Sequence, residues 1–429
     1  MRITSLWLIL IFFWTLPSFG QIVGKHISLR SESSLRQHAD SYFERNAFSH
    51  AAKLYNKIIL EHPDDQELQL RLADCYRMLR EPHSAEQWYR LALKRHQAEP
   101  EHLFSFASVL CATGKYQEAT NWFTRYLALK PSDQRALAAV ESLKNPQLLF
   151  DSRYEVQQLP IEIPGAVFSP VIFNDGLVFV GEGATGSLVK KMTTWIEGPY
   201  FDLYYVPLNQ DKPGFPKYLD DRLNSVFHEG PATFFDGGNK VIITRSAFKK
   251  GQEDTRNLQL MIAERKPNGT WTSPKKLFHH QDYSIAHPAI TQDGKVLYFS
   301  SDKPGGFGGS DLYRSELVDG QWTDPVNAGP QINTSGNELF PSLDADGTLF
   351  FSSDGHGGLG GLEIFRADLS GTSDPVNLGY PINSPGDDFG LVWHEDANKG
   401  YFSTDRSGQD RIFRFERKRQ LVNAAVPVN

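Results

Sequence analysis

Apolar residues recur at intervals of three and four between residues 35 and 144, which is the spacing of a buried face on an α-helix. Within this stretch the chain repeats itself every 34 residues. The repeated positions are small or aromatic: Ala39, Ala73 and Ala107; Ala51, Ala85 and Ala119; Tyr55, Tyr89 and Phe123. Small residues allow two helices to pack closely, and aromatic rings fill the space between them. The pattern predicts pairs of antiparallel helices.

Prolines and one glycine mark the ends of these helices. Pro63 and Pro131 end the second helix of a pair, because proline has no N–H and clashes with the preceding turn. Gly114 lies in the turn between two helices and fits a C-terminal cap. Residues 132–143 predict a last, solvating helix that closes the array. The repeat length and residue types are typical of tetratricopeptide repeats, so we expect TPR-like helical repeats over residues 31–145.

After residue 146 the chain changes to short apolar runs of alternating character, divided by Asp-Gly turns. Two stretches are near copies: each has a proline, an Asp-Gly turn, a Ser-Ser-Asp end and a Gly-Gly-x-Gly-Gly loop, and Pro288 lies 53 residues before Pro341. The pattern occurs five times, starting near Phe168, Gly230, His287, Phe340 and Phe389. Such a period with β-rich runs is typical of propeller blades. The predicted fold class is multidomain α and all-β, with a propeller of about five blades over residues 150–429.

Further segments between the copies predict the outer strands of the blades. Residues 322–329 are echoed by residues 374–379, and proline is tolerated there because an edge strand has N–H groups that face solvent. Residues 154–157 before the first copy and 421–423 after the last resemble the same strand. We expect one of these two to close the ring, because an open ring leaves unpaired strand edges.

Charge is distributed unevenly along the 429 residues, whose net charge is −7. Residues 1–145 hold 18 Lys/Arg against 15 Asp/Glu, and the remainder holds 26 against 36. Neither part offers a basic face for a phosphate backbone, so nucleic acid is not an expected partner.

The first 20 residues predict a secretory signal peptide. Arg2 is followed by an apolar run over residues 6–16, and Ser18 and Gly20 are the small residues required for cleavage after Gly20. The run is short for a membrane helix, although an uncleaved anchor remains the alternative. No cysteine lies near the cleavage point, which disfavours a lipoprotein. No later run reaches 18 apolar residues, so we expect no transmembrane segment after cleavage and a periplasmic location.

The two cysteines of the chain, Cys75 and Cys111, lie within the helical repeats. Two cysteines in an exported protein are able to form a disulfide. Buried free thiols that act as small apolar groups are the favoured interpretation.

Two kinds of motif resemble ligand-binding loops but lack the other residues that calcium or phosphate binding requires. Residues 344–347 read Asp-Ala-Asp-Gly, but a calcium loop needs more oxygen ligands, so a tight turn is favoured. The glycine-rich loops 305–309 and 357–361 are followed neither by Lys-Ser/Thr nor by a helix, so we interpret them as bends between strands. Asp302 and Asp354 begin these loops and are expected to cap local backbone N–H groups.

No catalytic, cofactor or metal site is predicted. The histidines with the best chance of forming a metal site, His279, His280, His287 and His356, do not have the spacing of zinc ligands. The chain contains neither a Gly-x-Ser-x-Gly elbow nor a His-Glu-x-x-His helix. We therefore expect no enzymatic activity.

The blade motif at residues 301–313 and 353–365, the Pro-Val-Asn segments at 325–327 and 375–377, and the helical repeats together resemble a known arrangement. They are similar to the front portion of OmpA-family envelope proteins of Bacteroidetes, including those associated with type IX secretion and gliding. Blades of that family are WD40-like repeats of the TolB type. The OmpA-like peptidoglycan-binding domain that usually follows there has no counterpart here, so we do not extend that activity to this chain. The resemblance implies a periplasmic scaffold or adaptor.

Two functions follow as hypotheses. In the first, the helical groove and the loop face of the propeller bind envelope proteins or peptides, with peripheral association with outer-membrane proteins. In the second, the propeller binds or cleaves a small ligand or glycan in its central channel. That channel would be lined by His228, Glu229, His287 and Glu338. Convergence of these four side chains in one polar pocket would favour the second hypothesis.

Overall fold

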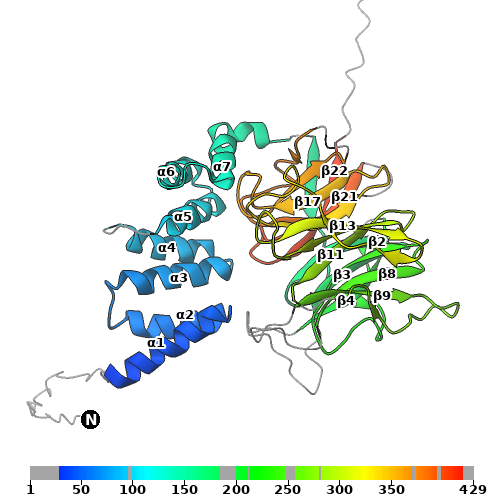
Figure 1. The fold of residues 1–429 in the computed structure, drawn as a ribbon, viewed down its shortest axis with the longest axis horizontal. Helices are drawn as coiled ribbons and strands as arrows, with labels where there is room; N and C mark the ends of the chain where they lie inside the picture. The colour runs from blue at the N-terminus through cyan, green and yellow to red at the C-terminus, as the bar shows by residue number, and fades with distance from the viewer. Residues whose placement is uncertain are drawn as a thin grey trace, which may run out of the picture.

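The computed structural model describes residues 29–94, 99–151, 153–183, 200–210, 212–247, 257–279, 282–369, 371, 373–393 and 398–418. Helices occupy the first part of the chain and strands the second (Figure 1). This confirms the predicted fold class, a helical solenoid followed by a β-propeller. The predicted signal peptide at 1–20 and the candidate closing strand at 421–423 lie outside the described residues.

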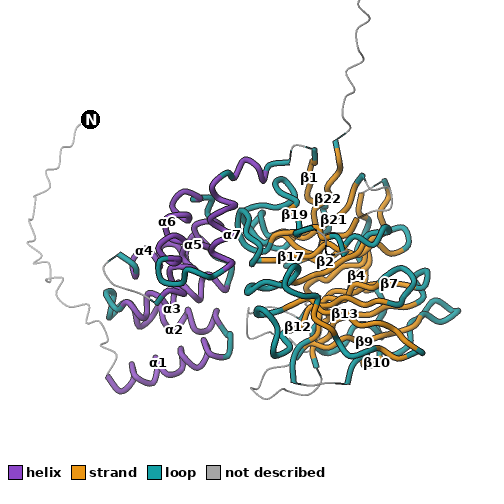
Figure 2. Tube along the Cα trace, turned by 45° about the horizontal axis from the view of Figure 1, so that its top comes forward, coloured by secondary structure: helices purple, strands orange, loops and turns teal. Residues whose placement is uncertain are grey.

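The solenoid consists of helical hairpins stacked side by side (Figures 1 and 2). Among the described residues the α-helices are α1 (Leu29–Glu44), α2 (Phe48–Ile59), α3 (Gln66–Met78), α4 (Pro82–Ala92), α5 (Pro100–Ala112), α6 (Tyr116–Leu127) and α7 (Gln134–Lys144). The nine small and aromatic positions that define the 34-residue repeat are at most 3% exposed. The periodicity therefore identified the residues that hold the hairpins together.

The first helix of each pair ends in the same way. Asn46, Arg80 and Gly114 lie 34 residues apart and have φ values of 57°, 58° and 73°. A residue in this left-handed region ends a helix, and glycine adopts it without strain. The cap predicted at Gly114 is confirmed, and the structure adds two equivalents that carry side chains.

The propeller is built from five antiparallel sheets, which we call blades 1 to 5. Blade 1 holds β2 (Val167–Phe173), β3 (Gly176–Glu182), β4 (Phe201–Asn209), β5 (Lys212–Pro213) and β6 (Lys217–Tyr218). Blade 2 holds β7 (Glu229–Phe235), β8 (Lys240–Ser246), β9 (Leu258–Glu264) and β10 (Lys275–Lys276). Blade 3 holds β11 (Ile285–Ile290), β12 (Val296–Ser301), β13 (Asp311–Val318), β14 (Gln321–Trp322) and β15 (Val326–Asn327). Blade 4 holds β16 (Glu338–Leu343), β17 (Leu349–Ser353), β18 (Glu363–Ala367) and β19 (Val376–Asn377).

Blade 5 closes the ring with a strand from the beginning of the propeller. It holds β20 (Asp388–Trp393), β21 (Lys399–Thr404), β22 (Arg411–Arg417) and β1 (Tyr154–Gln158). The antiparallel register places Tyr154 opposite Arg417 and Gln158 opposite Phe413. Closure by one end of the chain is thus confirmed, with β1 as the closing strand.

The outer strands are shorter than predicted. The segments at 322–329 and 374–379 each contribute a two-residue pairing with the preceding strand, through β15 and β19. Pro325 and Pro375 precede these pairs and have no N–H to donate. Asn333 completes the edge of blade 3: its Oδ1 accepts from the N–H of Leu312 at 2.7 Å, and its Nδ2 donates to the Leu312 carbonyl at 2.9 Å.

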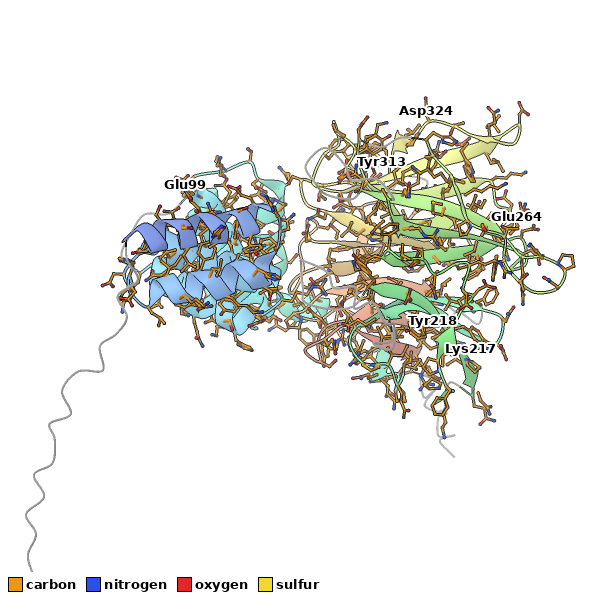
Figure 3. The ribbon with its side chains drawn as sticks, turned by 90° about the horizontal axis from the view of Figure 1, so that it is seen from below. Glu99, Lys217, Tyr218, Glu264, Tyr313 and Asp324 are labelled. Atoms are coloured by element: carbon orange, nitrogen blue, oxygen red, sulfur yellow. The ribbon has the colours of Figure 1, made fainter. Side chains whose placement is uncertain are left out.

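The last helix, α7, forms where the sequence predicts it and closes the solenoid, but part of it lies against the propeller instead of solvent. Loop 357–361 of blade 4 lies so close to α7 that a Cβ added to Gly357 would be 2.7 Å from the Ala138 carbonyl. The chain then passes through the short helix η1 (Pro146–Leu149). There the Tyr380 N–H donates to the Leu149 carbonyl at 2.5 Å. Figure 3, viewed from below, shows the solenoid beside the propeller.

Both cysteines are buried and free of a disulfide. Burial raises the pKa of Cys75 and of Cys111 to about 12 each. They therefore act as small apolar groups of the helical core, as the favoured interpretation expects. None of the helices that the structure describes is long and apolar enough to cross a bilayer.

Candidate functional site: a hollow in the helical groove

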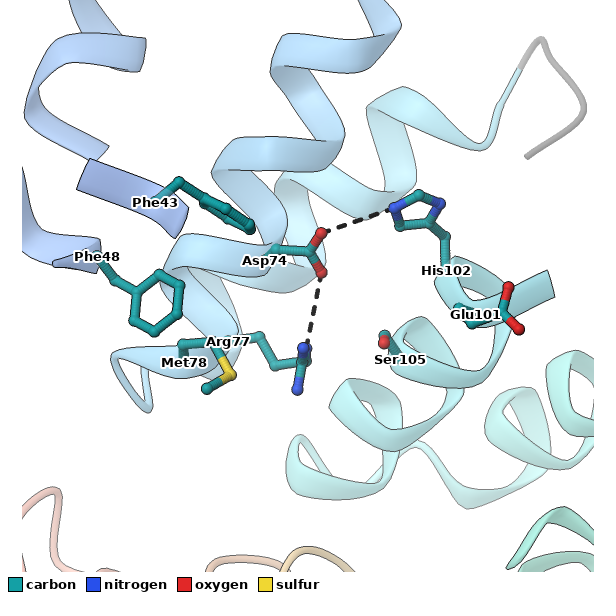
Figure 4. Close-up of a pocket in the computed structure, with 8 residues that line it drawn as sticks. All are labelled: Phe43, Phe48, Asp74, Arg77, Met78, Glu101, His102 and Ser105. Atoms are coloured by element: carbon teal, nitrogen blue, oxygen red, sulfur yellow. Dashed lines mark ion pairs between the residues drawn. The ribbon is translucent and has the colours of Figure 1, made fainter. Parts of the chain in front are cut away.

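A hollow of about 310 Å³ lies on the solenoid surface formed by α1, the start of α2, α3 and α5 (Figure 4). It is lined by Phe43, Phe48, Asp74, Arg77, Met78, Glu101, His102 and Ser105. Figure 4 shows the apolar side chains on one side and the α5 residues on the other, with Asp74 and Arg77 between them. The hollow therefore offers an apolar wall beside charged groups.

Helical spacing brings these residues together. Asp74, Arg77 and Met78 stand three and four positions apart on α3 and therefore share one face. Glu101 and His102 lie in the first turn of α5, which follows α3 by one repeat. The repeat spacing thus places residues of two separate helices along the same hollow.

Asp74 is the electrostatic centre of the hollow. Its carboxylate accepts a hydrogen bond from the Tyr89 hydroxyl at 2.5 Å and lies 3.6 Å from His102 Nε2 and 3.8 Å from Arg77 Nε. Burial alone would raise the pKa of Asp74, but these neighbours outweigh it and lower the pKa below its ordinary value. Asp74 is therefore a carboxylate at neutral pH and lies beside both the Arg77 guanidinium and the His102 ring.

Two nitrogen atoms of the residues that line the hollow are buried and make no hydrogen bond. Arg77 Nε and His102 Nδ1 are shielded from water and have no hydrogen-bond partner among the described residues, and Arg77 Nε lies in the ion pair with Asp74. A ligand in the hollow would therefore meet the terminal N–H groups of the Arg77 guanidinium, which are always donors.

A second polar cluster joins the solenoid to blade 5. Arg80, just after α3, places Nε 3.1 Å from Asp387 Oδ2 and Nη1 2.6 Å from Asp410 Oδ1. Burial alone would lower the pKa of Arg80, but these carboxylates and that of Asp405 outweigh it and raise the pKa. The groove and the propeller are thereby connected through the same helix.

Aromatic rings occupy the innermost strands of blades 3 to 5. His287 stacks on Phe340 with 3.9 Å between ring centroids, and Phe340 lies 4.6 Å from Phe389. His287 Nδ1 is also 2.9 Å from Ser300 Oγ. Burial lowers the pKa of His287 to about 3, so its ring is neutral. This histidine packs between blades rather than facing an open polar channel.

The other residues of the channel hypothesis have partners of their own. Glu229 pairs with Arg245 at 2.7 Å in blade 2. Glu338 accepts from Ser353 Oγ at 2.7 Å in blade 4. His228 Nδ1 accepts the Phe201 N–H of blade 1 at 3.2 Å. Among the described residues no hydrogen bond or ion pair joins His228, Glu229, His287 and Glu338 to one another, and ligand binding in the channel stays a prediction.

The glycine-rich loops are bends, as predicted, but their aspartates act at longer range. Asp302 Oδ1 accepts from the Ser284 N–H at 2.5 Å, and Asp354 Oδ1 accepts from the Asn337 N–H at 2.6 Å. Each partner lies 17 or 18 residues earlier, at the entry to the same blade, so the prediction of local capping was wrong. Residues 344–347 form the predicted turn, in which Asp344 Oδ1 accepts from the Thr348 N–H at 2.8 Å.

The candidate metal histidines do not gather. His356 Nε2 is 2.8 Å from the Ile332 carbonyl and packs beside Phe365, while His287 lies in the stack described above. His280 lies outside the described residues. In the part of the chain that the structure describes, no three His, Cys, Asp or Glu side chains are placed to hold a metal ion.

Comparisons with known proteins find one family model and several solved structures that are similar to parts of the chain. Residues 67–133 match the family of YpiA-like C-terminal tetratricopeptide repeats, and no curated protein matches the chain. The helical part is similar to the first TPR of Spaghetti (RPAP3) bound to an HSP90 peptide, at 21% identity and a TM-score of 0.26, over 29% of this chain and 99% of that one. A gluconolactonase from Xanthomonas campestris is 11% identical with a TM-score of 0.31, over 61% of this chain and 98% of that one.

A puromycin hydrolase is similar at 14% identity and a TM-score of 0.32, over 62% of this chain and 40% of that one. The chain thus combines tetratricopeptide repeats with a five-bladed β-propeller.

Proposed function

We propose that this protein is a non-catalytic, exported scaffold of the bacterial cell envelope that holds a peptide segment of a partner in its helical groove. The observation that carries this is the hollow beside Asp74, where the Arg77 guanidinium, ion-paired with Asp74, lies next to an apolar wall. A peptide supplies both a carbonyl oxygen for the guanidinium and an apolar side chain for the wall. The rigid propeller then displays a second surface beside the bound partner.

The proposed location rests on the sequence. The pattern of the first 20 residues supports export with cleavage after Gly20, and the resemblance of the blade motif supports a periplasmic envelope role linked to type IX secretion or gliding. N-terminal sequencing of the protein from a periplasmic fraction is expected to begin at Gln21. Recovery of the uncleaved chain in the cytoplasm would contradict export.

Charge reversal in the hollow tests the groove. We expect Arg77→Glu to reduce recovery of the wild-type partners from an envelope extract at least tenfold, measured by quantitative mass spectrometry of proteins retained on the immobilised chain. Reversal places a carboxylate next to Asp74 and removes the donor.

The matched control is Lys94→Glu, which reverses an exposed charge after α4, outside the hollow. It is expected to retain all partners. Equal recovery by Arg77→Glu and wild type, with both chains unfolding at the same temperature, would refute binding in the groove.

A further inference from the structure

Loop 305–309 of blade 3 and loop 357–361 of blade 4 are structural twins. In blade 3, the N–H groups of Phe307 and Gly308 donate to Asp311 at 2.7 and 3.0 Å. In blade 4, the N–H groups of Leu359 and Gly360 donate to Glu363 in the same way. A carboxylate at the start of the next strand thus holds each loop in one conformation.

The outer strands support both loops equally. Asn327 Nδ2 donates to Asp311 at 2.7 Å, and Asn377 Nδ2 donates to Glu363 at 2.6 Å. Each loop therefore has a preformed shape that does not depend on what lies outside it.

What lies outside differs completely. A Cβ added to Gly357 would be 2.7 Å from the Ala138 carbonyl and 2.9 Å from Ser142 Oγ, so this loop lies against α7. Of the residues that the structure describes, none lies within 4 Å of the same position on Gly305. Leu359 at the centre of the blade 4 loop is 0% exposed, whereas its counterpart Phe307 is 50% exposed.

We propose that loop 305–309 is a docking site for an α-helix of a partner protein that presents two small residues four positions apart. The precedent is intramolecular: Ala138 and Ser142 are four apart on α7 and allow the helix to approach loop 357–361. The exposed ring of Phe307 supplies a larger apolar contact than the leucine in the occupied twin. This inference names the partner class for the second surface and rests on the proposed scaffold function.

The vacant loop is continuous with the existing interface. The Gly309 N–H donates to the Gly336 carbonyl of the segment entering blade 4 at 2.8 Å, which joins the two loops along one side of the ring. Figure 3 labels Tyr313, near the start of β13, on the side of the propeller that faces the solenoid. A second copy of this chain is not the expected occupant, because its α7 already covers its own loop 357–361.

A helical probe tests the proposal on the whole protein. The probe is a synthetic peptide with the sequence of residues 132–145, stapled on the face opposite Ala138 and Ser142 and carrying a fluorophore. Fluorescence anisotropy is expected to show binding to the mature chain that weakens at least tenfold with Phe307→Asp. A second probe with leucine at both small positions is expected to bind at least tenfold more weakly than the first.

Matched variants make the result decisive. Phe215→Asp changes another exposed phenylalanine, 85% exposed in blade 1, and is expected to leave binding unchanged. Arg77→Glu should also leave it unchanged, which separates this site from the groove. If the probe instead displaced the chain's own α7 from loop 357–361, its binding would not change with Phe307→Asp. The proposal is overturned by absence of binding at the solubility limit, by equal losses in Phe307→Asp and Phe215→Asp, or by Phe307-dependent dimers in sedimentation velocity.

Discussion

The glycine-rich loops of blades 3 and 4 have the same backbone hydrogen bonds and opposite surroundings. In blade 3 residues 304–309 are exposed, whereas in blade 4 Leu359 is fully buried and Gly357 faces α7. The carboxylate that follows each loop fixes its conformation through local contacts. Exposure, by contrast, is decided by a helix more than 200 residues away in the sequence. The conformation of these loops and their exposure are therefore set by different parts of the chain.

The two loops are expected to differ most in how much the free energy of unfolding falls when their central side chains are removed. We expect Leu359→Ala to lower the free energy of unfolding by about 2–4 kcal/mol, because it leaves a cavity at a fully buried position. Phe307→Ala at the half-exposed twin is expected to change it by less than about 1 kcal/mol. Urea unfolding of both variants measures the contrast. Equal losses would mean that burial against the solenoid contributes nothing to stability.

Adding one methyl group to each loop isolates the contact with α7. Gly357→Ala and Gly305→Ala both impose strain of roughly 1–2 kcal/mol, because their φ values are 79° and 90°. The methyl group at 357 also meets the Ala138 carbonyl. We expect Gly357→Ala to cost about 1–2 kcal/mol more and to make the linker after α7 more sensitive to limited proteolysis. Equal proteolysis of both variants would contradict close docking.

Much of the fold was predictable because it rests on local periodicity. The spacing of Ala39, Ala73 and Ala107 identified the solenoid, and five recurrences of one strand pattern gave the blade number. The length of the outer strands was not predictable. The pairing there is only two residues long, and Asn333 extends the edge through a contact with Leu312 that spans 21 residues.

The candidate site was less accessible to sequence reasoning. Asp74, Arg77 and His102 look like ordinary polar residues of exposed helix faces, and nothing local shows that they line one hollow. The periodic placement of Asp74 and Arg77 on one helix face was the available signal. The polar residues of the channel hypothesis were easy to name from the sequence, but their partners, such as Arg245 for Glu229 and Ser353 for Glu338, were not.

The contact between the solenoid and blade 5 is expected to have a smaller effect on the free energy of unfolding, and this effect depends on pH. Burial and the neighbouring Asp387 carboxylate raise the pKa of Asp405 from 3.8 to about 7, against the opposing charge of Arg80. The folded protein thus binds a proton more tightly than the unfolded chain, and the free energy of unfolding falls as pH rises from 3.8 to about 7. Because solvent screens a partly exposed group, we expect a fall of about 1 kcal/mol.

Replacement by asparagine tests this assignment, because it keeps the oxygen that accepts the Asp387 N–H at 2.8 Å. Thermal unfolding of Asp405→Asn across this pH range is expected to show a smaller pH dependence. The remainder is expected from Glu338 and Glu363, because burial raises their pKa values to about 7 and about 8. Asp354→Asn, at the same position in blade 4, should keep the full dependence, and a dependence that is unchanged in Asp405→Asn would assign the titration to other groups.

The smallest effect concerns Arg80, which combines a strained backbone with the contact to blade 5. Its φ of 58° costs roughly 1 kcal/mol for a residue with a side chain, and its two ion pairs contribute about 1 kcal/mol because the side chain is 43% exposed. Arg80→Ala keeps the strain and loses the pairs, so we expect a loss of about 1 kcal/mol.

Arg80→Gly relieves the strain as it removes the pairs, so its unfolding free energy should stay within about 0.5 kcal/mol of wild type. Both variants nevertheless lose the contact and should show the same increase in proteolysis of the linker. The control is the first repeat, where Asn46 has a φ of 57° and carries no contact with the propeller among its described interactions. Asn46→Gly and Asn46→Ala should differ in stability but leave proteolysis unchanged, because strain at a cap and docking of the domains are separate consequences of one backbone position.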